Sequence, residues 1–186
     1  MAAGQGRRFG GDKLVAPLGR STVGLTAANH LRDALANVLV VVRSLTDNNA
    51  AMFAAEGFEV IGCERAVEGM GCSLACGVRA SCGAEGWLIA LADMPFLSPL
   101  TIAAVAQAID DPRGIAVARY ASRLGHPVGF GSAYQAELEA CGGDRGARDL
   151  FAKHAGQVTH VDVEDEGVVR DIDRREDLTG GVGLSN

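Results

Sequence analysis

Residues 1–13, MAAGQGRRFGGDK, form a glycine-rich basic stretch whose composition suits the binding of a nucleotide's phosphates. Glycines let backbone N–H groups approach phosphate oxygens closely, and such groups can hold an anion. Arg8 and Lys13 add charge where a triphosphate carries several negative charges. The stretch is not a P-loop, because Asp12 stands where lysine is needed, and not a dinucleotide fingerprint, because Phe9 stands at the third glycine position. The alternative is a solvated N-terminal arm.

Acidic residues in two segments are candidates for holding a metal ion. Asp93 directly follows the apolar run Trp87–Ala92, and a carboxylate at the carboxyl end of a strand faces the ligand crevice of an α/β sheet. Asp171 and Asp173 alternate along a predicted strand, so both share one face. Mg²⁺ keeps waters and takes phosphate oxygens, so one or two carboxylates suffice to bind it. The alternatives are that Asp93 caps the next helix and that Asp171 and Asp173 are ordinary solvated carboxylates.

Two further segments contain residues that suit substrate binding. His126 follows a predicted loop at 122–126 and either holds a substrate or closes a turn. The sequence GDRGAR, residues 143–148, is a polar turn that leads into a helix, whose N-terminus can hold an anion with help from Arg148. The alternative there is an ordinary helix cap. Around Ser73 the sequence GCSLA lacks the second glycine of a nucleophile elbow, so no serine hydrolase is indicated.

The order of apolar and helical stretches predicts the elements that position these residues. Val38–Val42 reads VLVVV, a β-branched run too short for a helix, which predicts a strand buried on both faces. We predict further strands at 58–61, 87–92, 115–119, 127–130, 158–163 and 168–171, and helices at 22–35, 46–56, 73–82, 98–109, 132–140 and 146–155. This alternation predicts an α/β fold, a three-layer, doubly wound, mostly parallel sheet with helices on both faces.

Composition limits the class of protein. The 186 residues, 48% hydrophobic and 22% charged, fit one domain that spans residues 1–186. The net charge is −6, so the composition gives no sign of the basic face that is typical of nucleic-acid binding. We find no secretory signal and no apolar run long enough for a membrane span, so we expect a cytoplasmic protein. The five cysteines, Cys63, Cys72, Cys76, Cys82 and Cys141, have no zinc-site spacing, and we expect them to be reduced.

Six segments together resemble one family. AAGQGRRFGGDKL resembles the A-A-G-x-x-x-R-x-G-x-x-K signature of the MobA-like nucleotidyltransferases. EGMGCSLACGV, ALADMP, GHPVGF, GDRGAR and DIDRREDL resemble later blocks of that family, in the family's order. The branch it resembles most is molybdenum cofactor cytidylyltransferase. The resemblance implies a Rossmann-like fold and transfer of CMP from CTP to the phosphate of molybdopterin cofactor, with Mg²⁺ as cofactor and release of pyrophosphate.

The resemblance also implies roles for individual residues. The nucleotide-binding residues would be Ala3, Gly4, Gly6, Arg8, Lys13, Gly71 and Ser73, of which Arg8 and Lys13 are also catalytic, together with Asp93. Asp93 and Asp173 would hold the metal, and His126, Asp144 and Arg148 would face the pterin. No protein nucleophile is required, because catalysis consists mostly of alignment and charge neutralisation. A molybdoenzyme or its maturation chaperone would be a further partner.

Several alternatives stay open at this point. Ala3 favours CTP, because the guanylyltransferase branch usually carries A-G-G in this loop. GTP as the nucleotide, or another small phosphorylated molecule as the acceptor, is compatible with the same fold. A non-catalytic carrier of molybdenum cofactor is an alternative of another class. The family has an apolar strand before A-A-G, whereas Met1 stands directly before Ala2 here. We therefore expect this first strand to belong to a longer native chain.

Overall fold

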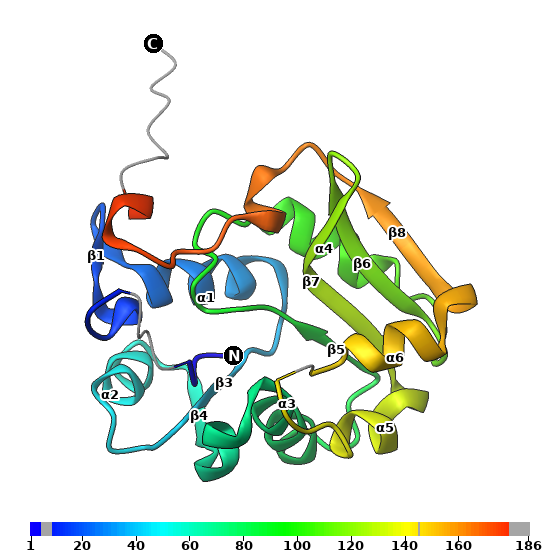
Figure 1. The fold of residues 1–186 in the computed structure, drawn as a ribbon, viewed down its shortest axis with the longest axis horizontal. Coiled ribbons are helices and arrows are strands. Elements are labelled where there is room, and N and C mark those ends of the chain that lie inside the picture. Colours follow the sequence, from blue (N-terminus) through cyan, green and yellow to red (C-terminus); the bar gives the residue numbers. More distant parts are fainter. Residues whose placement is uncertain (5–8, 145, 179–186) are drawn as a thin grey trace.

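The computed structural model of the chain describes residues 1–4, 9–144 and 146–178, and in these ranges strands and helices alternate (Figure 1). The helices are α1 (Val23–Ala34), α2 (Asn48–Ala55), α3 (Met70–Ala80), α4 (Pro99–Gln107), α5 (Gln135–Glu139) and α6 (Arg148–Lys153). The strands are β1 (Pro17–Leu18), β2 (Ser21–Thr22), β3 (Leu39–Val42), β4 (Glu59–Gly62), β5 (Gly86–Ile89), β6 (Ile115–Tyr120), β7 (Arg123–Gly131) and β8 (Val158–Asp162). The predicted α/β class is confirmed. None of these helices is long and apolar enough to cross a membrane.

Local sequence signals determine where two helices start. Thr22 precedes α1, and its hydroxyl accepts a hydrogen bond from the N–H of Leu25, as in an ordinary N-cap. Ser98 caps α4 in the same way, and Pro99 occupies the first turn, where its missing N–H costs nothing. Asp93 therefore does not cap this helix, which leaves its carboxylate for another partner.

The N-terminal residues connect two sheets. In one sheet β3 pairs with β4 in parallel; in the other the order is β5-β7-β6-β8, with β8 parallel to β6 and β7 antiparallel to both neighbours. The N–H of Ala2 donates to the carbonyl of Val41 at 2.8 Å. On the other side, the amino group of Met1 donates to Ala90 at 2.7 Å, and the N–H of Ala92 donates to Met1 at 3.0 Å. Met1 and Ala2 thus lie between β3 and the segment that follows β5.

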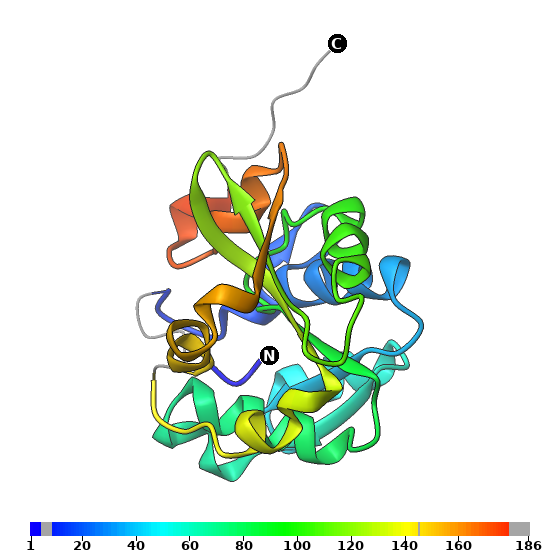
Figure 2. The same cartoon turned by 90° about the vertical axis from the view of Figure 1, so that its right-hand side faces the viewer.

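Helices cover both faces of the larger sheet. Ile115 and Val117 of β6 pack in a core with α3, α5 and α6, whereas Ala116 and Ala118 pack in a second core with α1 and α4. Successive side chains of a strand point to opposite faces, so a strand buried on both faces is apolar throughout. Figure 2 shows α4 on one side of these strands and α6 on the other.

The prediction of a strand at 168–171 is wrong. Glu166–Val169 forms a 3₁₀ turn instead. The carboxylate of Asp165 caps this turn by accepting a hydrogen bond from the N–H of Gly167 at 2.9 Å. A short side chain that bonds to the nearby backbone offers the chain an alternative to a strand.

The prediction of a loop at 122–126 is also wrong. β6 and β7 join through a tight turn at Ala121 and Ser122, whose φ angles are 45° and 68°, so that His126 lies on β7. Turns of this kind usually contain Asn or Gly, which tolerate positive φ. The Ala-Ser pair gave no such signal.

Candidate functional site

Lys13, Asp93 and Asp173 meet although they come from three distant parts of the chain. The ammonium of Lys13 lies 2.6 Å from Oδ2 of Asp93 and 3.3 Å from Oδ1 of Asp173. The Lys13 side chain is only 11% exposed, so these charges interact in a partly dehydrated environment. Asp171 is exposed, because its segment is not the strand that would have placed it on the face of Asp173.

Backbone contacts fix the positions of these three residues. Asp12 caps the 3₁₀ turn Lys13–Val15 by accepting a hydrogen bond from a backbone N–H of that turn at 3.1 Å. The N–H of Ile172 donates to the carbonyl of Asp93 at 2.8 Å, and the Ile172 side chain is fully buried in the core around α1 and α2. The segment 171–178 is thereby fastened to the loop that carries Asp93.

The cluster is arranged to hold positive charge. Burial alone lowers the pKa of Lys13, but the hydrogen bonds and charges of Asp93 and Asp173 outweigh it, so the pKa lies above its ordinary value. The ammonium shows that the two carboxylates converge on one cation. Carboxylate oxygens are the ligands that Mg²⁺ prefers, and waters and phosphates complete such a site. No group of three or more His, Cys, Asp or Glu side chains in the described ranges is placed to hold a metal ion. Asp93 and Asp173 are two carboxylates that could hold one together with waters and phosphate oxygens.

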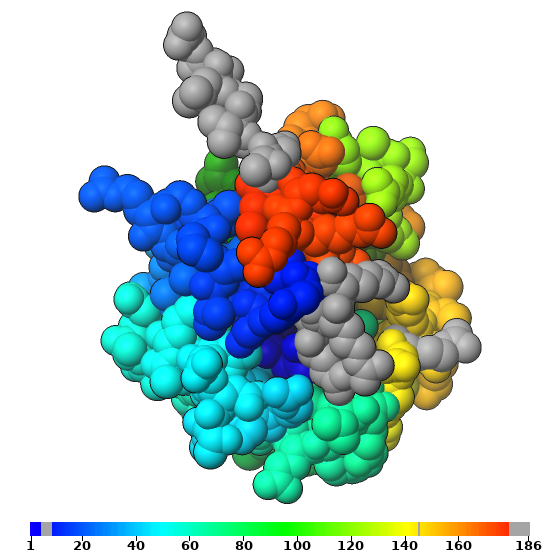
Figure 3. Space-filling view, turned by 60° about the vertical axis from the view of Figure 1, so that its left-hand side comes forward, coloured from blue at the N-terminus to red at the C-terminus, as the bar shows by residue number. Residues whose placement is uncertain are grey.

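Ala3 and Gly4, both predicted to bind nucleotide, line a cavity of about 380 Å³. Asp12 also borders it, and the remaining wall comes from the end of β3 and the start of α2. Figure 3 shows the face on which these segments meet, with dark blue N-terminal residues recessed beside the cyan α2 region. Gly6 and Arg8, the other predicted residues of this loop, lie outside the described residues.

Sequence reasoning missed the polar residues that line this cavity after β3, among them Arg43, Asp47 and Asn49. The guanidinium of Arg43 lies 3.2 Å from the carboxylate of Asp47. Asn49 is only 6% exposed, and its side-chain oxygen has no hydrogen-bond partner in the described part of the chain. Such buried oxygens are rare in folded proteins. All three residues follow the VLVVV strand, and the rule that ligands bind at the carboxyl ends of strands is a signal that points to them.

His126 lies on β7, beside the strand that leads to Asp93. Its Nδ1 is 3.2 Å from the carbonyl oxygen of Ile89. Since a carbonyl only accepts, Nδ1 carries the proton and Nε2 keeps its lone pair. Burial lowers the pKa of His126 below its ordinary 6.5, and the charges of Asp93 and Arg148 also act on this pKa. His126 is therefore neutral at pH 7 and within electrostatic reach of Arg148, which is exposed at the start of α6.

The segment with Gly71 and the turn with Asp144 touch through their backbones. The N–H of Gly71 donates to the carbonyl of Gly143 at 2.8 Å. A Cβ added to Gly71 would lie 2.5 Å from the carbonyl oxygen of Gly142, so only glycine fits at this position without a shift. Ser73 is 3% exposed, whereas Asp144 is exposed. The structure thus brings the two predicted substrate segments into direct contact.

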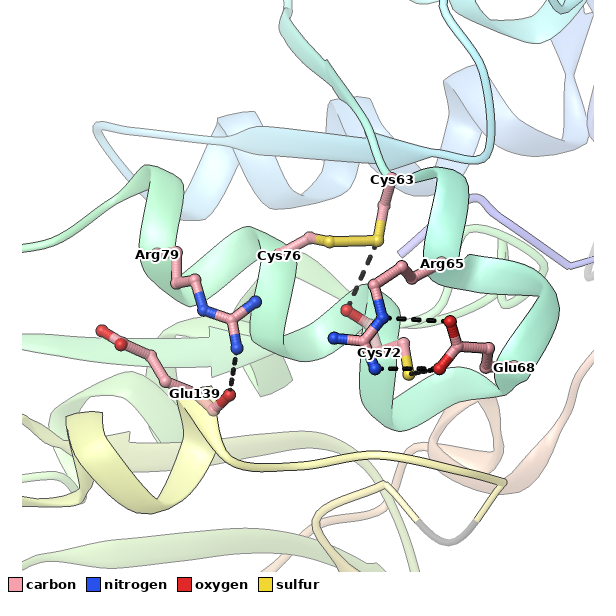
Figure 4. The surroundings of a disulfide bond; sticks show 7 residues. All are labelled: Cys63, Arg65, Glu68, Cys72, Cys76, Arg79 and Glu139. Carbon is pink, nitrogen blue, oxygen red and sulfur yellow. Dashed lines mark hydrogen bonds and ion pairs between the residues drawn. A yellow bond between two sulfur atoms is a disulfide. The ribbon is translucent and has the colours of Figure 1, made fainter.

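The expectation that all five cysteines are reduced is wrong for one pair. Cys63 and Cys76 form a disulfide (Figure 4). Cys72, Cys82 and Cys141 are free. Cys63 directly follows β4, Cys76 lies on α3, and their Cα atoms are 6.1 Å apart. Sequence spacing gives no sign of this pairing, because it arises where α3 packs against the end of the sheet.

Comparison with other sequences identifies similar proteins along nearly the whole chain. Residues 1–158 match the profile of the MobA-like NTP transferase domain. The chain is 32% identical to purine catabolism protein PucB of Bacillus subtilis (strain 168), with 95% of this chain and 91% of that protein covered. It is 29% identical to nicotine blue oxidoreductase of Paenarthrobacter nicotinovorans, with 96% and 92% covered.

Comparison with solved structures identifies the same fold. Rv0371c from Mycobacterium tuberculosis H37Rv superposes with a TM-score of 0.77 at 25% identity, covering 95% of this chain and 91% of that one. A manganese complex of Rv0371c superposes with a TM-score of 0.75 at 25% identity, covering 94% and 91%. A nucleotidyl transferase from Methanothermobacter thermautotroptrophicus shares the fold, with a TM-score of 0.81 at 21% identity and 95% and 90% covered.

Proposed function

Because the chain belongs to the MobA-like NTP transferase family, we propose that it is a Mg²⁺-dependent cytidylyltransferase, which moves CMP from CTP to the phosphate of molybdopterin cofactor and releases pyrophosphate. The observation that carries this proposal is the convergence of Lys13, Asp93 and Asp173 on one point. Family membership supports nucleotidyl transfer as the reaction class. Ala3 supports CTP, and the resemblance of the six sequence blocks supports the pterin acceptor.

The proposed chemistry needs charge neutralisation more than a nucleophile from the protein. The attacking phosphate oxygen and the α-phosphate are both anionic, so the site must offset their repulsion and align them. Lys13 and Arg8 would neutralise the phosphates of the nucleotide. Asp93 and Asp173 would hold Mg²⁺, which when bound acts as a Lewis acid on phosphate oxygens.

The two substrates would lie on either side of this charge cluster. Backbone N–H groups at Ala3, Gly4 and Gly6, with the segment that carries Gly71 and Ser73, would bind the nucleotide. On the acceptor side, neutral His126 would accept a hydrogen bond from the pterin through Nε2. Arg148 would pair with the phosphate of the acceptor, and Asp144 would accept hydrogen bonds from the pterin ring. A molybdoenzyme or its maturation chaperone would receive the product.

The test is pyrophosphate release with each of the four nucleoside triphosphates and Mg²⁺, with and without molybdopterin cofactor. We expect release with CTP alone among the four, and only when the cofactor is present. Equal rates with CTP and GTP would remove the argument from Ala3. Release that does not depend on the pterin would point to another acceptor.

A variant of Asp93 separates an enzyme from a non-catalytic carrier. Asp93→Asn is expected to lower pyrophosphate release roughly 100-fold, because the substitution removes one of the two charges that hold the metal. Asp110→Asn, which replaces an exposed carboxylate at the end of α4, is the matched control and should keep full activity. A wild-type protein that binds pterin but releases no pyrophosphate with any nucleotide would be a carrier.

A further inference from the structure

The Cys63–Cys76 disulfide encloses the segment that we propose binds nucleotide (Figure 4). The two cysteines are 13 positions apart, and Gly69, Gly71 and Ser73 lie between them. Cys63 follows β4 directly, whereas Cys76 lies in the second half of α3. The bond therefore closes a covalent loop around this binding segment.

Few other contacts fix the first part of the loop. The 3₁₀ turn Glu64–Glu68 has no buried residue, and its ion pair between Arg65 and Glu68 is largely exposed. Exposed ion pairs of this kind contribute little to stability. Cys63, by contrast, is 2% exposed, and its N–H donates to the carbonyl of Val42 at 2.8 Å. The disulfide thus ties α3 to a fixed end of the sheet.

The surroundings also suit the reduced state. Sγ of Cys63 lies 3.4 Å from the carbonyl oxygen of Cys72, which can accept a hydrogen bond from the Cys63 thiol once the bond opens (Figure 4). Cys76 is partly exposed whereas Cys63 is buried, so Cys76 is the partner that an attacking thiolate would approach. The surroundings therefore accommodate both the disulfide and the dithiol form of Cys63 and Cys76.

We propose that Cys63 and Cys76 form a redox modification site that controls nucleotide binding. In the disulfide form the bond holds Gly69, Gly71 and Ser73 in the arrangement that binds nucleotide, and in the dithiol form this segment loses its tether. The proposal rests on the proposed function, because that function assigns the segment to the nucleotide.

A small dithiol or a dithiol protein is the reductant. One of its thiolates attacks Sγ of Cys76, which forms a mixed disulfide and releases Cys63 as a thiolate that takes up a proton. The second thiolate of the reductant attacks the mixed disulfide and releases Cys76, which is protonated in turn. Two electrons and two protons pass to the protein, and the reductant leaves as a disulfide. A disulfide oxidant reverses the reaction.

The experiment measures the binding of CTP and GTP, each with Mg²⁺, to the full chain by titration calorimetry before and after treatment with dithiothreitol. We expect the dissociation constant to rise roughly tenfold on reduction and to recover on reoxidation. Mass spectrometry after alkylation follows the bond itself. Cys63→Ser should bind nucleotide weakly, and its affinity should not change with dithiothreitol. Cys76→Ser repeats this test at the partly exposed partner. Cys82→Ser, at an exposed free cysteine, is the control and should respond like the wild type.

Equal and measurable affinities in the two redox states would overturn this inference and leave the proposed function intact. A Cys76→Ser variant that still responds to dithiothreitol, or an oxidised protein without the Cys63–Cys76 bond, would also overturn it. Absence of nucleotide binding in both states would overturn the proposed function and, with it, this inference.

Discussion

At the scale of single residues, the chemistry of the site depends on three charges that stabilise one another. Asp93 and Asp173 would repel each other without a cation between them, and Lys13 supplies that cation at 2.6 Å and 3.3 Å. The two carboxylates are thus held where they can bind a cation in the absence of substrate. Two uncharged residues elsewhere in the candidate site, His126 on β7 and Asn49 in the cavity wall, lead to predictions of a different kind.

Asn49→Ala is expected to separate nucleotide binding from folding. Because the Asn49 side-chain oxygen has no hydrogen-bond partner, its removal gives up no hydrogen bond of that atom, and the free energy of unfolding should change by less than about 1 kcal/mol. Nucleotide affinity should fall roughly fivefold, because Asn49 borders the cavity next to Ala3. Denaturant unfolding and calorimetry measure the two effects, with exposed Asn37→Ala as the control. A variant that loses stability and keeps its affinity would contradict the prediction.

His126 predicts a pH dependence of stability. Its pKa is lowered in the folded protein by burial, so the unfolded chain binds more protons as the pH falls below the ordinary 6.5. The stabilisation is therefore present above pH 6.5 and is lost as the pH falls through the lowered pKa. We expect the free energy of unfolding of the wild type to fall over this range, and that of His126→Gln to fall less.

Urea unfolding between pH 5 and 8 measures this difference. Burial also lowers the pKa of the Met1 amino group to about 6, and the charge of this group lowers the pKa of His126, so the difference between the two curves reports the titration of His126 together with its coupling to Met1. Parallel curves would show that His126 does not account for the pH dependence.

At the scale of elements, the contact between the start of α3 and the turn before α6 couples the two substrate segments. Glycines at 69 and 71 allow the two backbones to touch, with the hydrogen bond from Gly71 to Gly143 at 2.8 Å. A side chain at either of these positions would force the segments apart, whereas a Cβ at Gly142 or Gly143 meets no atom within 4 Å. In the proposed function, one shared contact rather than two independent loops would set the positions of nucleotide and acceptor.

Gly71→Ala tests this contact. Its new Cβ would lie 2.5 Å from the carbonyl oxygen of Gly142, so one backbone must move. We expect kcat/KM for pyrophosphate release to fall at least roughly tenfold, because small misplacements of reacting groups are costly. Gly156→Ala is the control, since a Cβ there meets no atom within 4 Å. Wild-type kinetics in Gly71→Ala would show that the contact does not position the substrates.

At the scale of the whole molecule, the site is closed by segments from both ends of the chain. Ala2 bonds to β3 and Met1 bonds to the segment that follows β5, and the segment 171–178 returns to the loop of Asp93. Figure 1 shows this segment, in red, beside the blue elements that follow the first loop. Ile172 anchors the return, because its side chain is fully buried and its N–H is bonded to Asp93.

Ile172→Ala is expected to weaken both the fold and the metal site. Truncation of a fully buried isoleucine should lower the free energy of unfolding by about 2–5 kcal/mol. Because Asp173 is the next residue, the Mg²⁺ concentration needed for half-maximal activity should rise as well. Thermal unfolding and a Mg²⁺ titration measure the two effects, with the exposed Val67→Ala as the control. Unchanged Mg²⁺ dependence in a less stable variant would show that the anchor does not position Asp173.

The sequence by itself determined the α/β class, the starts of α1 and α4 and the chemical types of the charged residues. These depend on local patterns, such as the β-branched run at 39–42 and the caps at Thr22 and Ser98, which act within a few residues of the chain. Local patterns misled where a single contact decided the outcome, as at Asp165, whose capping bond makes a 3₁₀ turn in place of a strand.

Only the tertiary structure decided which of these residues meet. Lys13 and Asp173 are 160 positions apart, and nothing in their local sequence encodes the buried Ile172 that brings them together. The Cys63–Cys76 bond and the cavity wall at Asn49 likewise depend on how helices pack against the sheet. Local propensity acts between near neighbours, whereas these contacts arise from burial of apolar surface across the whole chain, which brings distant segments to one end of the sheet.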